Sequence, residues 1–313
     1  MKKKILILGG CGYIGTELSL KLSATYDVCV VDTMWFGKKI SNKKNLKIFK
    51  DDIRELKKNY FKNVYAVIHL ANIANDPSVE LNPSLSWEIN VLALKKIIEG
   101  SIKNKVKKFI FASSGSVYGI KNEKNVTEEL SLVPISTYNK TKMIAERVLF
   151  SYQDKIKIFI IRPATVCGLS LRMRFDISVN LLTLQALKYG VISLNGGKQI
   201  RPNINLRDMI RVYEHFIKED IVPGIYNAGF ENISLKDLSK KISTIIPCKI
   251  KIKKVNDPRS YRINSAKLLR TGFVPKYSVA DAINEIKKTY DNNQLKENIS
   301  NYNVKLMKRI KVI

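Results

Sequence analysis

The sequence predicts an α/β fold: a doubly wound parallel sheet with helices on both faces, joined to a smaller α/β lobe. Short apolar runs of strand length alternate with longer segments of helix length, which is typical of successive βαβ units. The first apolar run, residues 4–8, leads directly into a glycine-rich turn at residues 9–15, and helix-like sequence follows. With 313 residues the chain is long enough for a large core and two lobes.

The glycine-rich turn predicts a phosphate site. Glycines at positions 9, 12 and 15 permit a tight turn and let the backbone approach a diphosphate at the positive end of the following helix. The second predicted strand, residues 28–31, ends at Asp32. A carboxylate there can accept the hydroxyls of an adenosine ribose and would repel a 2′-phosphate. This unit therefore predicts a Rossmann-type NAD site rather than an NADP site.

The remaining elements follow in order along the chain. Helices are predicted around residues 85–103 and 136–152, and further strands at 46–49, 64–70, 109–112 and 156–161. In open α/β sheets, ligands bind beyond the carboxyl ends of the strands. We therefore expect the side chains that follow these strands, among them Asp52, Asn72 and Ser114, to gather at the edge where the glycine turn lies.

Tyr138, Lys142 and Ser114 form the candidate catalytic set. A tyrosine hydroxyl is a poor base at neutral pH because its ordinary pKa is about 10. A lysine four residues later lies on the same face of a helix, and we expect its ammonium to lower the pKa of Tyr138. Tyr138 would then act as a general base, and Ser114, at a strand end, would share the proton of a substrate alcohol.

Together these motifs resemble the extended short-chain dehydrogenases/reductases, in the nucleotide-sugar epimerase/dehydratase group that includes UDP-glucose 4-epimerases. The resemblance covers about residues 4–290 and includes the glycine turn, the runs 52–54, 69–71 and 113–119, and Arg162-Pro163. It implies that Ser114, Tyr138 and Lys142 are catalytic. It also implies that NAD is held by Gly9, Gly12, Tyr13, Ile14, Gly15, Asp32, Asp52, Ile53, Leu70, Ala71, Asn90, Tyr138 and Lys142.

The resemblance also implies where a nucleotide-diphosphate sugar binds. Residues 201–208 and 257–262 are similar to family stretches whose arginines grip the diphosphate, which suits the planar, two-pronged guanidinium. Arg201, Arg259 and Arg262 are therefore candidate substrate contacts, and Asn180, opening the next helix, is a fourth. We expect the NAD-binding domain at 1–166 and 203–228, the sugar-binding lobe at 167–202 and 229–290, and a C-terminal tail at 291–313.

Departures from the family pattern narrow the reaction. Dehydratases of this group carry a Glu or an Asp-Glu pair just after the catalytic Ser or Thr, whereas Gly115 and Ser116 stand here. The cysteine that C3/C5 epimerase-reductases use near that serine is also missing between residues 112 and 119. Asn72 and Asn205 replace the usual residues of the family and make the sugar uncertain. We therefore predict a nucleotide-sugar 4-epimerase that oxidises the sugar C4 transiently.

Two alternatives remain open. Residues 172–180 resemble a subgroup that includes enzymes oxidising nucleotide-linked heptoses, so a 4-dehydrogenase or reductase that releases the 4-keto sugar is the first. The same segment is equally consistent with packing between the lobes. The second alternative is a catalytically silent NAD-binding scaffold, against which the intact Ser114, Tyr138 and Lys142 speak.

Composition bears on other classes of protein. The net charge of +28 comes from 55 basic residues, of which only twelve are arginine, scattered along the whole chain. A specific nucleic-acid surface would concentrate that charge, so we predict none. No apolar run approaches the roughly 20 residues that cross a bilayer, and the four cysteines and two histidines show no metal-ligand spacing. A reduced cytoplasmic protein is the simplest interpretation of the cysteines. The resemblance, in turn, implies a role in polysaccharide biosynthesis.

Two expectations concern assembly. The helices around 85–103 and 136–152 should share one face, which in the resembling family makes a homodimer contact. Residues 298–313 form an amphipathic tail that we expect to pack on its own chain or on a partner rather than on a membrane.

Overall fold

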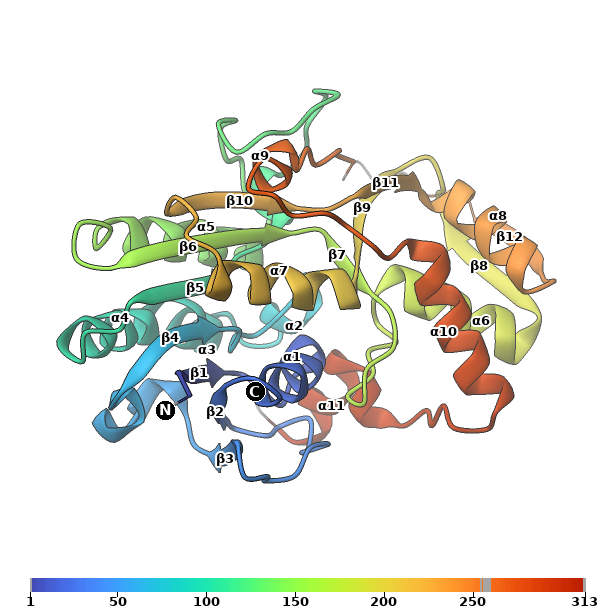
Figure 1. Cartoon of the computed structure of the whole chain (residues 1–313). Coiled ribbons are helices and arrows are strands. Elements are labelled where there is room, and N and C mark those ends of the chain that lie inside the picture. Colours follow the sequence, from blue (N-terminus) through green and yellow to red (C-terminus); the bar gives the residue numbers. More distant parts are fainter. Residues whose placement is uncertain (1, 254, 256–259, 312–313) are drawn as a thin grey trace.

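The computed structural model describes residues 2–253, 255 and 260–311, and its centre is a seven-stranded parallel sheet (Figure 1). The strand order is β10-β6-β5-β4-β1-β2-β3, so the chain reverses direction across the sheet between β1 and β4. This arrangement confirms the predicted doubly wound α/β fold. The strands are β1 (Lys4–Leu8), β2 (Asp27–Asp32), β3 (Leu46–Lys50), β4 (Val64–His69), β5 (Lys108–Ala112), β6 (Lys157–Pro163) and β10 (Gly224–Ala228).

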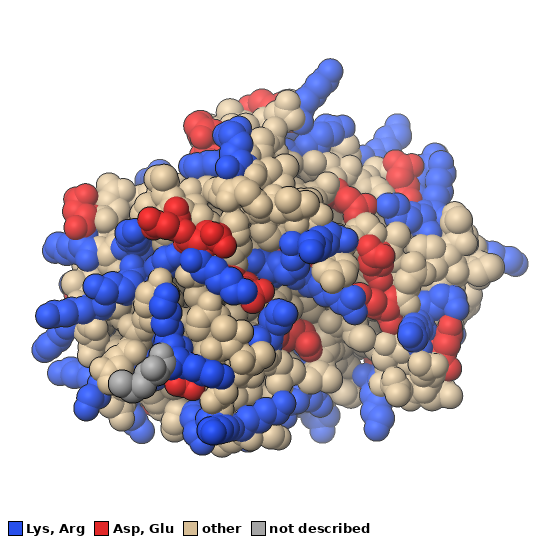
Figure 2. Space-filling view, viewed as in Figure 1, with Lys and Arg blue, Asp and Glu red and all other residues tan. Residues whose placement is uncertain are grey.

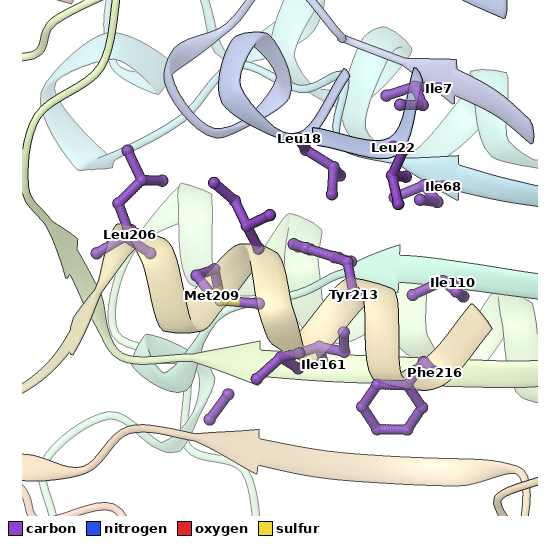
Figure 3. Packing of buried hydrophobic residues seen from close by; sticks show 14 of the residues in the cluster. Ile7, Leu18, Leu22, Ile68, Ile110, Ile161, Leu206, Met209, Tyr213 and Phe216 are labelled. Atoms are coloured by element: carbon purple, nitrogen blue, oxygen red, sulfur yellow. The ribbon is translucent and has the colours of Figure 1, made fainter. Parts of the chain in front are cut away.

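Helices cover both faces of the sheet because its strands are apolar on both sides. In β1, Ile5 and Ile7 face a core shared with α1 (Tyr13–Ser23) and α7 (Leu206–Lys218). Their neighbours Leu6 and Leu8 face the opposite core, shared with α4 (Ala93–Lys103) and α5 (Thr137–Phe150). Figure 3 shows the first of these cores, where Met209, Tyr213 and Phe216 of α7 lie over the sheet and near α1.

The predicted helix around 85–103 is present but is divided into three parts. It begins as α3 (Pro83–Trp87), widens into the π-helical turn η3 (Glu88–Leu92) and continues as α4. The π-helical turn contains Asn90, and such turns are often found at functional sites. The predicted helix at 136–152 is α5, which Ser136 caps by accepting a hydrogen bond from the amide of Asn139.

A second group of elements lies beside the main sheet, on the right in Figure 1. Two small sheets, β11-β9-β7 and β12-β8, pack with α6, α8 and α10. The predicted division into two domains remains a prediction. The bounds are β7 (Thr165–Cys167), α6 (Ser178–Tyr189), β8 (Val191–Asn195), β9 (Ile200–Asn205), β11 (Glu231–Ser234), α8 (Leu235–Ile245), β12 (Lys249–Lys253) and α10 (Val279–Asp291).

The C-terminal tail packs on its own chain, which is one of the two outcomes that the sequence left open. Met307 of α11 is 3% exposed and joins the core on the α4–α5 side of the sheet. α11 also contacts α2 (Asp76–Val79), and Figure 1 shows it at the lower centre of the molecule. The remaining short elements are η1 (Ile53–Glu55), η2 (Lys58–Phe61), α2 (Asp76–Val79), η4 (Gly115–Tyr118), α9 (Ala266–Leu269), η5 (Ile299–Asn301) and α11 (Asn303–Arg309).

Basic side chains are spread over the face shown in Figure 2 and are not confined to one element. This distribution fits a solvated, lysine-rich surface rather than a localised nucleic-acid patch. Among the described residues, no helix is both long enough and apolar enough to cross a membrane.

Candidate active site

A cavity of about 490 Å³ opens at the carboxyl edge of the main sheet. The glycine turn, with Gly9, Gly12 and Gly15, lines one part of it. The predicted catalytic side chains Ser114, Tyr138 and Lys142 line another part. Residues that are far apart in the sequence therefore share one cavity, as the positions of the predicted strand ends required.

The glycine turn has the geometry that a bound diphosphate needs. Gly9 has φ +84°, and a Cβ there would lie 2.5 Å from the amide nitrogen of Ala71. A Cβ on Gly15 would lie 2.3 Å from the carbonyl oxygen of Gly9, so this glycine permits the close approach of α1 to the turn. Gly12 differs, because a Cβ there would meet only the Gly9 oxygen at 3.3 Å and otherwise project into open space.

The N-terminus of α1 is also free to receive an anion. Gly12 is the N-cap residue, and no side chain caps the first turn of the helix. Its amides, beginning at Tyr13 and Ile14, therefore point toward the cavity that both residues line. An uncapped helix N-terminus beside an open glycine turn fits the diphosphate of NAD.

Asp32 is the last residue of β2, and Asp52 follows the neighbouring strand β3, as predicted. The Asp32 carboxylate accepts hydrogen bonds from the amides of Cys11 at 2.9 Å and Met34 at 2.7 Å. Burial raises its pKa, although the two amides act in the opposite direction. The carboxylate of Asp52 is paired with Arg54 at 2.9 Å and caps η1, in which Ile53 is buried. Both carboxylates are thus fixed by the chain, at positions consistent with an adenosine site.

Ser114 and Tyr138 lie together at the edge of the cavity. Ser114 directly follows β5 and its hydroxyl lies 2.7 Å from that of Ser116. Burial raises the pKa of Tyr138 to about 12, and Lys142 is not among the groups that lower this pKa, so the expected effect of Lys142 is not found. The groups that oppose the rise are the hydroxyl of Ser114, through a hydrogen bond, and the charge of Arg174.

Lys142 is buried, and its ammonium points at the sheet. Its Nζ donates to the carbonyl oxygen of Ala112 at 2.7 Å and lies 4.8 Å from the centre of the Phe111 ring. Burial lowers the pKa of Lys142 to about 7, and the carboxylate of Glu146 acts against this shift. The lysine therefore contacts a strand end and an aromatic face rather than the tyrosine hydroxyl.

A buried polar network stands behind Lys142. Glu146, one helical turn further along α5, forms a two-pronged ion pair with Arg162 at 3.0 and 2.6 Å. Ser113 donates to the same carboxylate, and Arg162 also donates to the hydroxyl of Tyr118 at 2.8 Å. Every charge in this network has a partner, so the network fixes the helix that carries Tyr138 and Lys142 against the sheet.

Asn90 connects the loop after β4 to this helix. Its side chain accepts from the amide of Ile73 at 2.8 Å, donates to the Ile73 carbonyl at 3.1 Å and reaches Thr141 Oγ1 at 3.2 Å. The loop includes Leu70, which lines the cavity, and Ala71, which contacts the glycine turn. The side chain of Asn90 thus joins the loop after β4 to α5, and its contact with NAD stays a prediction.

The predicted substrate residues do not gather at the cavity as a group. Asn180 is fully buried. Its side chain accepts a hydrogen bond from the Gly168 amide and donates to the Tyr13 hydroxyl and the Arg174 carbonyl, which favours a structural role. Arg201 is half-buried, and its charge acts on Tyr261, which lines the cavity. Arg262 is exposed and does not line the cavity. Arg259 lies outside the described residues.

Several cavity residues were missed or left undecided at the level of sequence. Arg172, Arg174 and Asp176 line the cavity, so the segment 172–180 does more than pack between lobes. Arg174 is paired with Asp176 at 2.9 Å. The lining also includes Phe36, Asn75, Asp76, Tyr261, Asn303 and Val304. Only the clustering of two arginines and an aspartate in 172–176 could have pointed to this wall.

The position after Ser114 carries no carboxylate, as the sequence indicated. A Cβ on Gly115 would lie 2.3 Å from the end of the Ile263 side chain and 3.1 Å from the Pro163 carbonyl oxygen. The two acidic residues among the described lining are Asp76, which accepts from Ser136 at 2.6 Å, and Asp176. No group of three or more metal-ligating side chains occurs among the residues that the structure describes.

The chain is similar in sequence to known NAD-dependent enzymes. The model of the NAD dependent epimerase/dehydratase family matches residues 5–229. A UDP-glucose 4-epimerase of Lactobacillus helveticus is 25% identical, and the alignment covers 90% of this chain and 94% of that protein.

Two solved structures have the same fold along almost the whole chain. One is a UDP-N-acetylglucosamine 4-epimerase from Methanobrevibacter ruminantium in complex with UDP-N-acetylmuramic acid. It has a TM-score of 0.85 and 23% identity, covering 94% of this chain and 100% of that one. The other is MoeE5 with UDP-glucuronic acid and NAD, with a TM-score of 0.83, 22% identity and coverage of 92% and 99%. At these identities the likeness to both structures establishes the fold.

Proposed function

Because the chain belongs to the NAD-dependent epimerase/dehydratase family, we propose that it is a nucleotide-sugar 4-epimerase. Members of this family are enzymes that use NAD, and this chain has a glycine turn whose open side fits that cofactor. The proposal adds the site of reaction, the sugar C4, and the outcome, inversion of that carbon.

One observation carries the proposal. Ser114, which follows β5, and the α5 residues Tyr138 and Lys142 line the same cavity as the glycine turn, although these three parts of the chain are far apart in the sequence. A proton-accepting hydroxyl beside a dinucleotide site supports removal of hydrogen from a secondary alcohol as a proton and a hydride. Bound NAD supplies the acceptor for the hydride.

The chain's own groups handle the proton. In the proposed mechanism, Tyr138 takes the proton of the C4 hydroxyl, and Ser114 accepts or donates a hydrogen bond at the same oxygen. Burial holds the pKa of Tyr138 near 12, so the phenolate must be favoured by the Ser114 hydrogen bond and by the charge of Arg174. Returning the hydride to the opposite face of the 4-keto sugar, with the proton given back by Tyr138, completes the inversion.

The absence of a free carboxylate beside Ser114 supports epimerisation over dehydration. Dehydration requires a group that removes the C5 proton, and the positions that follow Ser114 hold Gly115 and Ser116. Asp76 and Asp176, the acidic residues in the described lining, are engaged with Ser136 and Arg174. Chemistry at one carbinol carbon therefore accounts best for the groups present.

We propose a nucleotide diphosphate as the handle by which the sugar is held. Arg201 supports this, because its charge acts at Tyr261 in the cavity wall. Arg262 and Asn180 receive less support from their positions, since one is exposed away from the cavity and the other is buried and fully hydrogen-bonded. The predicted role of Arg259 stays a prediction.

The runner-up is a 4-dehydrogenase or reductase that releases the 4-keto sugar. The observation that favours it is the position of segment 172–176 in the cavity wall, because this segment resembles that of the heptose-oxidising subgroup. Arg174 lines the cavity and its charge lowers the pKa of Tyr138, which supports a role beside the reacting carbon.

One experiment separates these functions. The purified chain is incubated with UDP-, GDP-, CDP- and dTDP-sugars, and the products are followed by NMR. An equilibrium mixture of C4 epimers formed without added NAD supports the epimerase. Accumulation of a 4-keto sugar together with NADH supports the dehydrogenase and refutes the proposal.

A further inference from the structure

Arg172 is a buried cation that forms no ion pair among the residues that the structure describes, although the carboxylates of Asp176 and Asp32 act on it from a distance. The residue is 2% exposed, and its guanidinium lies 4.2 Å from the centre of the Phe36 ring. Its Nε has no hydrogen-bond partner within the described part of the chain. Asp176, the carboxylate nearest in the sequence, is already paired with Arg174. Burying an unsatisfied charge is costly, and an anionic ligand that accepts from the free donor would offset part of that cost.

The segment that carries Arg172 is fixed to the first turn of α1. Ser170 Oγ donates to the carbonyl oxygen of Tyr13 at 2.9 Å, and the Leu171 amide donates to Glu17 at 2.7 Å. Tyr13 in turn donates through its hydroxyl to the carbonyl of Gly168 at 2.7 Å. These contacts hold the segment beside the uncapped helix N-terminus, where the diphosphate is expected.

The C-terminal tail braces the same segment from the other side. Asn303 Oδ1 accepts from Arg172 Nη2 at 2.6 Å, and the Asn303 amide donates to Asp176 at 3.1 Å. The side chain of Asn301 donates to the Met173 carbonyl at 3.2 Å, and its own carbonyl accepts from the Phe175 amide at 2.9 Å. Asn303 thereby fixes one edge of the guanidinium, while the Nε edge keeps its donor free.

We propose that Arg172, oriented by Asn303 of the C-terminal tail, binds the diphosphate of NAD as a second contact besides the glycine turn. The guanidinium presents donors in a fixed fork that suits a phosphate, and stacking on Phe36 limits its rotation. The tail then contributes to cofactor retention although it lies at the opposite end of the sequence from the glycine turn. This inference rests on NAD as the cofactor and is independent of the sugar reaction.

The test is calorimetric titration of the full-length protein, freed of bound nucleotide, with NAD and ADP-ribose. Adenosine is measured by its competition with ADP-ribose. Arg172→Met keeps an apolar side chain against Phe36 and removes the charge. We expect it to weaken NAD and ADP-ribose about tenfold or more, as for loss of a charge-assisted hydrogen bond, and to leave adenosine unchanged. Asn303→Ala should weaken both dinucleotide ligands by a smaller factor.

Arg207→Met is the matched control. Arg207 also stacks on an aromatic ring, 5.2 Å from the centre of Tyr277, but it is outside the cavity and its side chain is 55% exposed. Its loss should not change NAD affinity. Unchanged affinity for NAD in Arg172→Met, or an equal loss for adenosine, would overturn the proposal, because the residue would then act on the fold alone. If Arg172→Met does not fold, the affinities of Arg172→Lys and Asn303→Ala for NAD, ADP-ribose and adenosine are compared in the same way.

The outcomes of this test are separate from those of the sugar assay. A protein that loses NAD affinity with Arg172 but yields a free 4-keto sugar would contradict the epimerase and leave the cofactor contact intact. If Arg172→Met bound NAD as tightly as the unmodified protein and the protein were an active epimerase, the cofactor contact would be refuted and the epimerase would stand.

Discussion

Tyr138 sits among groups that work in opposite directions on its ionisation. Burial raises its pKa to about 12, while a hydrogen bond from Ser114 and the charge of Arg174 favour the phenolate. A general base is most effective when its pKa lies near the working pH. The basicity of Tyr138 therefore depends on Ser114 and Arg174, and Lys142 does not contact the tyrosine hydroxyl.

We predict that Tyr138→Phe lowers kcat by about 10²–10⁴-fold, the usual contribution of a general acid–base group. The fold should be retained, because the phenyl ring keeps the apolar contacts of the side chain. Tyr152→Phe is the control, since Tyr152 ends the same region but binds Glu99 at 3.0 Å on the surface. Equal activity of the two variants would refute the role of Tyr138.

A second prediction concerns the effect of the buried Lys142 on how the stability of the protein depends on pH. An unfolded lysine has a pKa of about 10.4, whereas burial lowers that of Lys142 to about 7 in the folded protein. Between these values the unfolded chain holds a proton that the folded chain has lost, so stability due to this group rises with pH. The burial penalty is greatest at and below pH 7.

Lys142→Met should therefore reduce the rise in melting temperature between pH 7 and pH 10. Differential scanning calorimetry across this range measures the difference from the unmodified protein. Lys140→Met, an exposed change on the same helix, should leave the pH dependence unaltered. If the melting temperature of Lys142→Met rose with pH as much as that of the unmodified protein, burial of the ammonium would have no effect on stability.

The positions of several candidate site residues could be predicted at the residue scale, because glycine turns and strand ends have local sequence signatures. Gly9, Asp32 and Ser114 lie where the pattern placed them, around one edge of the sheet. The direction of the pKa shift of Tyr138 could not be predicted, since its burial and the charge of Arg174 near it depend on the folded chain. The same reason applies to Asn180, whose partners Tyr13 and Gly168 are settled only by packing.

Within the first βα unit, two glycines serve different purposes and can be separated by substitution. Gly12→Ala places a methyl group in the open space of the cavity, so it should weaken NAD binding with little loss of stability. Gly15→Ala brings a Cβ to 2.3 Å from the Gly9 carbonyl and should lower the melting temperature. Calorimetric titration with NAD and thermal unfolding of both variants test this contrast. If Gly12→Ala lowered the melting temperature and Gly15→Ala only weakened NAD binding, Gly12 would not be the glycine that faces the cavity.

The six strands predicted at the level of elements are all present, because strands buried on both faces are continuous apolar runs. The two small sheets were not predicted. Their strands are short and partly polar, as in Lys249–Lys253, which alternates lysine with isoleucine and pairs with Val191–Asn195 far away in the sequence. The docking of α11 was equally hidden, since it depends on contacts of Asn301 and Asn303 with residues more than a hundred positions earlier.

Considered as a whole, the molecule has one face on which α4 and α5 lie against each other over the sheet. Leu92, at the start of α4, is 64% exposed. We predict that this face forms a homodimer, with a mass in analytical ultracentrifugation of twice 35.7 kDa. Leu92→Glu should shift the protein toward the monomer. A monomeric unmodified protein at micromolar concentration would refute this prediction.

The central claim is inversion at C4 by a hydride that never leaves the protein. The most direct measurement uses a nucleotide sugar accepted by the enzyme and labelled with deuterium at C4, with NMR of the products and no added NAD. We predict that the C4-epimer accumulates with the deuterium retained at C4. Loss of the label to solvent, or its appearance in released NADH beside a 4-keto sugar, would contradict the account.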